Sequence, residues 1–158
     1  DIQLLVGYLP KNFQYLVKEE LFKIPVFGTC IRKLGSYPIN RKNHKKAFIT
    51  TQKIIQDMQQ KKESITVFPE GTRNPNGGLL SFKNGFVKIS AESQIPIVPI
   101  AINGCQKIFS GKNIIARRHP LSIIIGKPIA PPLNTDKEEL NKVKEKTWQT
   151  IYNMLEER

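Results

Sequence analysis

The sequence is poor in the residues on which several protein classes depend. It has two cysteines, Cys30 and Cys105, and they form no C-x-x-C pair, which argues against a disulfide-built scaffold or a cysteine zinc module. We interpret both as reduced thiols, buried or incidental, as on a cytosolic face. The longest apolar stretch, residues 95–102, is far shorter than the roughly 20 residues that cross a bilayer. No segment of these residues has the pattern of a transmembrane helix or a signal peptide.

Histidine is equally scarce, and no nucleotide-binding or hydrolase signature is present. Only His44 and His119 occur, and neither has an acidic residue at the spacing of a catalytic pair. We interpret His44 as a surface residue at a helix start and His119 as part of a basic loop. No cluster of ligating side chains suggests a metal, and no cofactor is expected. The absence of a P-loop, a dinucleotide fingerprint and a G-x-S-x-G elbow argues against kinases, dehydrogenases and serine hydrolases.

Acidic residues are also few, 13 against 25 basic ones, so the formal net charge is +12. Such an excess attracts a polyanion, which can be nucleic acid, phospholipid headgroups or an acidic carrier protein, although a lysine-rich solvated surface explains part of it. No nucleic-acid-binding module is recognisable, so salt-sensitive binding to DNA or RNA is a minor alternative. A membrane surface fits better, because basic residues alternate with apolar ones.

The alternation of apolar runs with helical patterns predicts an α/β domain. Asn43 is a candidate N-cap for a helix reaching about Lys61, and Thr135 and Glu138 have the spacing of a capping box for a last helix. Helical spacing predicts one apolar face on each of these helices. The faces consist of Ala47, Thr51, Ile54, Ile55 and Met58 on the first helix, and of Leu140, Val143, Trp148, Ile151 and Leu155 on the last. A short helix is expected around Phe82, Phe86 and Ile89. The expected strands are residues 13–17, 36–39, 65–68, 97–102 and 121–125.

Two apolar segments are flanked by basic residues. The first, residues 21–27, is either a buried helix start or an interfacial element with a basic rim, and we expect burial for most of its side chains. The second, residues 104–120, either contacts an anionic membrane or is an ordinary surface loop.

The run Phe68-Pro69-Glu70-Gly71-Thr72-Arg73 follows the apolar residues 65–67. Pro69 cannot donate to a strand ladder, so it is expected to end the strand. Gly71 allows close approach of a ligand to the backbone, and Arg73 offers a rigid fork of donors that matches phosphate oxygens. The run is therefore a candidate phosphate-binding loop at a strand end, where ligands of open α/β sheets bind. An ordinary surface turn with a solvated arginine is the alternative.

The hexapeptide FPEGTR resembles the most specific motif of the glycerolipid acyltransferases. Three further blocks follow that family's order. Residues 35–41 resemble its G-x-x-F-I-D-R block, with Pro38 and Asn40 in place of the usual aromatic residue and aspartate. Residues 97–102 resemble its proline-centred apolar block, and residues 17–21, which lead to Pro25 and Gly28, are similar to its lysine-bearing segment. The resemblance covers residues 1–128.

The resemblance implies an α/β fold with a mixed central sheet flanked by helices, and a single acyltransferase domain over residues 1–158, truncated at its N-terminus. The implied activity is acyl transfer from acyl-coenzyme A or an acylated acyl carrier protein to 1-acylglycerol-3-phosphate, giving phosphatidate in phospholipid synthesis. The alternative acceptors are glycerol-3-phosphate and other lysolipids. The implied location is the cytoplasmic face of the cell membrane, bound peripherally or anchored by a segment outside this chain.

The resemblance also implies roles for individual residues. The family uses a histidine as general base and orients it with an aspartate five positions later, and Asp1 matches that aspartate. The histidine would precede Asp1, so the chain as given is expected to be inactive or nearly so, although the parent protein is expected to be an enzyme. Because the histidine is missing, a non-catalytic module that binds anionic lipid headgroups is a further alternative.

The acceptor's phosphate is expected to be held by cations. By the resemblance, Lys18, Arg41 and Arg73 bind the phosphate, and Gly71 and Thr72 add backbone approach and a hydroxyl. A carboxylate beside a phosphate is repulsive unless it is paired. Glu70 is therefore expected to fix an arginine or loop N–H groups, with contact to a glycerol hydroxyl as the second possibility.

Overall fold

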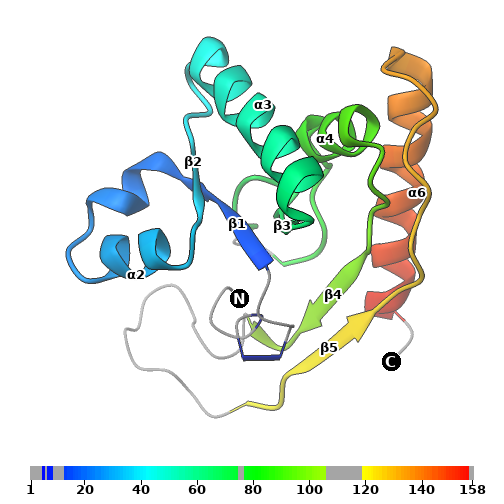
Figure 1. The fold of residues 1–158 in the computed structure, drawn as a ribbon. Helices are drawn as coiled ribbons and strands as arrows, with labels where there is room; N and C mark the ends of the chain where they lie inside the picture. Colours follow the sequence, from blue (N-terminus) through cyan, green and yellow to red (C-terminus); the bar gives the residue numbers. More distant parts are fainter. Residues whose placement is uncertain (1–4, 6, 9–12, 75–76, 106–118, 157–158) are drawn as a thin grey trace. The chain divides into compact units, whose positions relative to one another are not determined.

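The computed structural model describes residues 5, 7–8, 13–74, 77–105 and 119–156 (Figure 1). The chain divides into two compact units, an N-terminal unit of residues 2–68 and a C-terminal unit of residues 69–158. No helix among the described residues combines the length and the apolar character needed to span a bilayer. Both cysteines are free. Cys30 is exposed and Cys105 is half-buried, so the predicted alternative of buried thiols is wrong for both.

The N-terminal unit is built on a parallel three-stranded sheet in the order β2-β1-β3. The strands are β1 (Phe13–Lys18), β2 (Tyr37–Ile39) and β3 (Ser64–Thr66). Tyr15 and Val17 of the central strand are buried. In the register of β1 and β2, Lys18 lies opposite Ile39. All three strands point the same way, so their carboxyl ends share one edge of the sheet.

Helix α3 (His44–Lys61) packs against β2 and β3 and matches its prediction closely. Asn43 is its N-cap, with the side-chain oxygen accepting a hydrogen bond from the Lys46 N–H at 3.0 Å. The predicted apolar face is confirmed, because Ile54, Ile55 and Met58 are buried. Asp57 is buried on the same helix, which periodicity did not predict.

Strand β3 differs from its prediction. It ends at Thr66, before Val67 and Phe68, and its residues are half-buried or exposed. Pro69 therefore does not end the ladder, because pairing has stopped three residues earlier. The last pair in the β1–β3 register is Tyr15 with Thr66, and β3 lies at the edge of the sheet, so residues 67–68 have no strand partner on either side.

The apolar segment at residues 21–27 is not buried, contrary to expectation. It forms the 3₁₀ helix η1 (Glu19–Lys23) and the start of helix α2 (Phe27–Lys33), which lead off from the end of β1 (Figure 1). Only Gly28 and Ile31 of α2 are buried, and η1 has no buried residue. A tight turn followed by a two-turn helix offers too little surface to enclose its own apolar side chains.

The C-terminal unit contains helix α4 (Gly85–Ser93), the antiparallel pair β4 (Ile100–Asn103) and β5 (Ser122–Ile125), and helix α6 (Lys137–Glu156). Helix α6 packs against β4 and α4. Buried apolar residues of this unit include Val87, Ile89, Leu140, Val143 and Ile151.

Two boundaries in this unit differ from expectation. The strand predicted over residues 97–102 begins only at Ile100, after Pro99, and is preceded by a single bridge between Ile97 and Ile129. Pro99 thus precedes the ladder, as its missing N–H requires. Helix α6 begins at Lys137, and the main-chain oxygen of Asp136 accepts from the Leu140 N–H at 2.9 Å. The predicted capping box does not form, since the helix starts one residue too late for Thr135 to cap it.

Candidate functional site

Two of the predicted phosphate-binding cations lie at one edge of the parallel sheet. Lys18 is the last residue of β1, and Arg41 follows β2 by two residues. Because Lys18 pairs in register with Ile39, the two cations follow adjacent strands at their carboxyl ends, the usual place for a ligand in an open parallel sheet. Both are exposed, and the Lys18 ammonium lies 3.5 Å from the Glu20 carboxylate.

Asn40 fixes the turn that carries Arg41. Its Nδ2 donates to Glu19 Oε2 at 2.6 Å, and its Oδ1 accepts from the backbone N–H groups of Lys42 and Asn43 at 3.1 and 3.0 Å. One amide therefore ties the end of β1 to the turn after β2. An aspartate here would offer Glu19 a second carboxylate instead of a donor. Asn40, which stands where the family has an aspartate, therefore supplies the donor that Glu19 needs.

A small pocket opens beside this turn. Its volume is about 190 Å³, below the roughly 300 Å³ at which pockets for small ligands begin. The Thr50 hydroxyl donates to the Pro38 carbonyl at 3.1 Å across its wall. The lining residues are Glu19, Pro38, Asn40, Lys46, Ile49 and Thr50.

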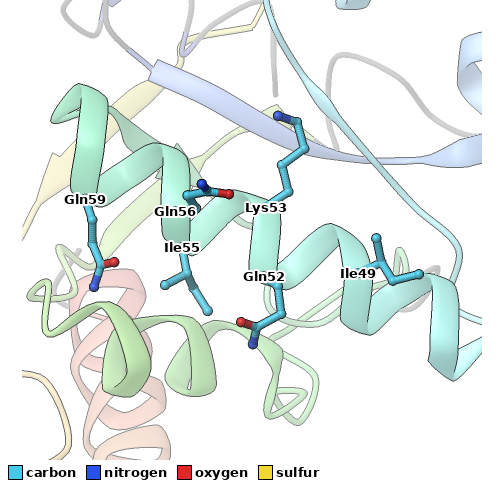
Figure 2. A pocket seen from close by; sticks show the side chains of 6 residues that line it. All are labelled: Ile49, Gln52, Lys53, Ile55, Gln56 and Gln59. Carbon is cyan, nitrogen blue, oxygen red and sulfur yellow. The ribbon is translucent and has the colours of Figure 1, made fainter.

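A larger hollow of about 560 Å³ lies along α3 (Figure 2). Gln52, Ile55 and Gln59 point to one side of the helix, whereas Lys53 points to the other. These side chains supply amides, one ammonium and apolar carbon, but no group that takes up a proton near neutral pH. We therefore assign no chemistry to this helix face. The lining residues are Ile49, Gln52, Lys53, Ile55, Gln56 and Gln59.

The loop after the hexapeptide FPEGTR is closed at its base within the C-terminal unit. Glu70 Oε2 accepts from the Leu80 N–H at 2.8 Å, and the Pro69 carbonyl accepts from the Lys83 N–H at 2.8 Å. Glu70 thus binds a loop N–H, which is one of the structural roles expected of it. Its contact with a substrate hydroxyl stays a prediction.

Helix α6 holds the same loop from outside. The Trp148 Nε1–H donates to the Leu80 carbonyl at 3.0 Å, so both polar groups of the Leu80 backbone are paired. The Trp148 ring stacks on Tyr152 with centroids 5.1 Å apart and planes at 13°. The apolar spacing of this helix predicts only that Trp148 lies on its packed face. No local signal could have found this bond, because its partners are 68 residues apart.

The exposed part of the loop presents Thr72 and Arg73 to solvent. Gly71 has a φ of 74°, which a glycine adopts readily and other residues rarely do. Beyond it, Thr72 and Arg73 are exposed, and Arg73 makes no hydrogen bond or ion pair with any other described residue. Asn74 turns the chain back, because its side-chain amide donates to the carbonyls of Gly77 and Gly78. The guanidinium is therefore available to an anion.

The general base and its orienter are not assembled by the described residues. Asp1 lies outside them, as do residues 106–118 of the basic-apolar loop, so both proposals stay predictions. His44 is exposed at the start of α3, as expected. His119 Nδ1 lies 2.9 Å from the Pro120 carbonyl, and neither histidine pairs with a carboxylate in the described part of the chain. Over the same residues, no group of three or more metal-ligating side chains occurs.

An ionic cluster around the buried Asp57 carboxylate joins β2 to α3. The Tyr37 hydroxyl donates to Asp57 Oδ2 at 2.7 Å, and the ammonium groups of Lys53 and Lys61 lie 3.1 and 3.0 Å from the same carboxylate. The hydrogen bond from Tyr37, followed by those from the two lysines, lowers the pKa of Asp57 to about 2. Burial, together with the bond to Asp57, raises the pKa of Tyr37 well above its usual value. Near neutral pH Asp57 therefore stays ionised and Tyr37 stays protonated, so the cluster is structural.

The chain is similar to known acyltransferases in sequence and in fold. The family model described as Acyltransferase matches residues 1–103. The 1-acyl-sn-glycerol-3-phosphate acyltransferase of Cocos nucifera is 30% identical over 143 residues, covering 90% of this chain and 45% of the relative. The enzyme of that name from Saccharomyces cerevisiae is 28% identical over 159 residues, covering 99% of this chain and 52% of the relative. The chain thus spans about half the length of these curated relatives.

A solved structure supports the same assignment. The crystal structure of the 1-acyl-sn-glycerophosphate acyltransferase PlsC from Thermotoga maritima superposes with a TM-score of 0.75 at 27% identity, covering 100% of this chain and 62% of that one. The predicted α/β class is confirmed, with parallel and antiparallel pairing divided between two small sheets. By its sequence match over residues 1–103, the chain belongs to the acyltransferase family.

Proposed function

We propose that the protein carrying this chain transfers an acyl group from a thioester to the free hydroxyl of 1-acylglycerol-3-phosphate, giving phosphatidate. The observation that carries this proposal is the FPEGTR loop, which is braced at Glu70 and leaves the Arg73 guanidinium open to an anion. The names of the relatives and of the structural neighbour support the same acceptor.

In the proposed reaction the acceptor hydroxyl attacks the thioester carbonyl. A carbon–oxygen bond forms, the carbon–sulfur bond breaks, and the hydroxyl proton passes by way of a general base to the leaving thiolate. Asp1 would orient the base. Arg73, Arg41 and Lys18 would hold the acceptor's phosphate, because guanidinium groups bind phosphate oxygens in pairs and an ammonium adds charge. Thr72 would add a hydroxyl to that site.

The acyl donor and the location belong to the same proposal. Either coenzyme A or acyl carrier protein would carry the acyl group, and the net charge of +12 favours an acidic carrier. The same charge favours an anionic membrane surface, which would be the cytoplasmic face of the cell membrane.

The test is acyl transfer from a radiolabelled thioester by the whole protein that carries this chain, with acceptors compared at equal concentration. We expect the highest kcat/KM with 1-acylglycerol-3-phosphate, above glycerol-3-phosphate and above 1-acylglycerophosphocholine. A preference for glycerol-3-phosphate would refute the proposed acceptor but would still support acyl transfer as the reaction. Binding of lysophosphatidate without any transfer would overturn the reaction and support a non-catalytic lipid-binding module.

A further inference from the structure

The connection between η1 and α2 carries exposed apolar side chains. Ile24, Pro25 and Val26 form this apolar tip, and the exposed fractions of Ile24 and Val26 are 46% and 79%. The tip lies in the N-terminal unit, where η1 and α2 project from the carboxyl end of β1 (Figure 1). Exposed apolar residues in a continuous run favour an interaction surface over a solvated loop.

The backbone holds the tip in a fixed shape. Val26 has a φ of 64°, an uncommon conformation for a β-branched residue. Hydrogen bonds on both sides enforce it, from the Phe27 N–H to the Pro25 carbonyl at 2.7 Å and from the Gly28 N–H to the Ile24 carbonyl at 2.8 Å. Strain of this kind persists where the surrounding structure imposes it and is concentrated at functional positions. The Val26 side chain is thereby held outward.

Cations flank the tip along the sequence. Lys23 precedes it, and Arg32 and Lys33 lie on α2, all three exposed. Arg32 is fixed toward the tip, because its Nη2 donates to the Phe22 carbonyl at 2.9 Å and its guanidinium carbon lies 5.9 Å from the centre of the Phe22 ring.

The acidic residues of this segment do not outweigh the cations. Glu20 lies 3.5 Å from the Lys18 ammonium, so those two charges offset each other. Glu19 accepts from the neutral amide of Asn40 and keeps its charge. One negative charge thus remains against three positive ones, and the net charge of the segment is positive.

We propose that this tip docks the protein on an anionic lipid bilayer. Ile24 and Val26 enter the boundary between headgroups and acyl chains, and Lys23, Arg32 and Lys33 contact anionic headgroups. Only six positions separate Ile24 from Lys18, which ends β1 at the candidate phosphate-binding edge. The docked tip therefore brings the membrane surface to the end of the sheet where a lipid phosphate would bind. This inference rests on the proposed function for its acceptor, but its test needs no acyl transfer.

The first experiment measures insertion of the tip directly. Ile24→Trp places a fluorescent ring at a position with ordinary extended backbone (φ −73°, ψ 124°), and Leu133→Trp is the control, at an 86% exposed apolar residue of the other unit. The whole protein is mixed with vesicles of phosphatidylcholine and phosphatidylglycerol whose chains are brominated, and the quenching of Trp148 in the unchanged protein is subtracted. We expect quenching at least about threefold stronger at position 24 than at position 133. Equal quenching at the two positions, or none at position 24, would overturn the proposal.

The second experiment tests the basic rim. In the Ile24→Trp background, Lys23→Gln together with Lys33→Gln should weaken association of the tip with anionic vesicles by about fivefold for each lysine, since that is the contribution of a basic residue near such a surface. The control pair is Lys137→Gln with Lys146→Gln, two exposed lysines of α6. Equal effects of the two pairs would overturn the role of the rim.

The same measurements separate this proposal from its alternatives. Quenching at position 24 in a protein that transfers no acyl group would keep the docking surface and refute the proposed function. Acyl transfer to a vesicle-bound acceptor while position 24 stays unquenched would support the proposed function and refute the docking surface. A blue-shifted emission at position 24 that depends on protein concentration, without vesicles, would assign the tip to a second copy of the chain instead.

Discussion

Trp148 and Glu70 bind opposite polar groups of one residue, Leu80. The indole donates to the Leu80 carbonyl at 3.0 Å, and the carboxylate accepts from the Leu80 N–H at 2.8 Å. The loop that presents Arg73 is therefore braced both by its own motif and by the last helix of the chain. A change on α6, far along the sequence, is expected to affect the phosphate-binding loop.

Trp148→Phe tests that link in the whole protein. The substitution keeps an aromatic ring against Tyr152 and removes only the donor to Leu80. A lost hydrogen bond of this kind is worth about 0.5–1.5 kcal/mol, so we expect the KM for the lysophosphatidate acceptor to rise about twofold to tenfold. The KM for the thioester should change less, because the proposed function places only the acceptor's phosphate at this loop.

Ile151→Val is the matched control for Trp148→Phe. It removes a methyl group from a buried residue of the same helix and costs about 0.5–1.5 kcal/mol of stability, while the hydrogen bonds of Trp148 and Glu70 to Leu80 are kept. Its acceptor KM should equal that of the unchanged protein. If the two variants shift the acceptor KM alike, the effect of Trp148 is one of general stability.

Arg73→Ala tests the proposed phosphate clamp. Hydrogen bonds to a charged partner contribute about 1.5–3 kcal/mol, so kcat/KM for lysophosphatidate should fall about tenfold to a hundredfold, mainly through the acceptor KM. Arg73→Lys should recover only part of the loss, because an ammonium lacks the paired donors. Lys88→Ala, at an exposed cation of α4, is the control for loss of positive charge. An Arg73→Ala protein with unchanged kcat/KM would refute the clamp.

Asn40→Asp tests the bond between the ends of β1 and β2. The substitution replaces the donor to Glu19 with a second carboxylate, so we expect a loss of about 1–3 kcal/mol in the free energy of unfolding, measured in urea. Adding Glu19→Gln should restore much of it, because glutamine can donate to the new carboxylate. Strictly additive effects of the two substitutions would show that the two side chains do not interact.

Asp57→Asn tests the ionic cluster around Asp57 through its pH dependence. The pKa of Asp57 is lowered from its usual 3.8 to about 2. The ionised carboxylate therefore stabilises the folded state in full at pH values above 3.8. The contribution, about 2 kcal/mol, is lost as the pH falls through about 2. The stability difference between the unchanged protein and Asp57→Asn should be constant from about pH 7 to 5 and shrink between about pH 4 and 2. A difference for Asp57→Asn that stays undiminished at pH 2 would refute the assignment.

The features that were predicted correctly depend on neighbours in the sequence. Helix α3 follows from a cap at Asn43 and from apolar residues at helical spacing, and both signals act within a few residues. The role of Glu70 toward a loop N–H could be anticipated because an unpaired carboxylate beside a phosphate would be unfavourable.

The features that were missed depend on distant partners or on which side of an element is covered. The bond from Trp148 to Leu80 and the pairing of Asn40 with Glu19 join residues that no local pattern connects. Residues 21–27 were expected to be buried because they are apolar, but composition alone does not say whether another element covers them. In the structure Val26 is 79% exposed.

The central position of β1 has a consequence for synthesis and refolding. Both of its neighbours come later in the chain, and β3 pairs with it across 51 positions, from Phe13 to Ser64. At roughly 5–20 residues per second, a nascent β1 waits several seconds with an open ladder edge until β3 leaves the ribosome. Pairing over such separations is slow, and an open edge can pair with another chain. Fragments that end before Ser64 should therefore aggregate, and any refolding protocol should succeed best at low protein concentration.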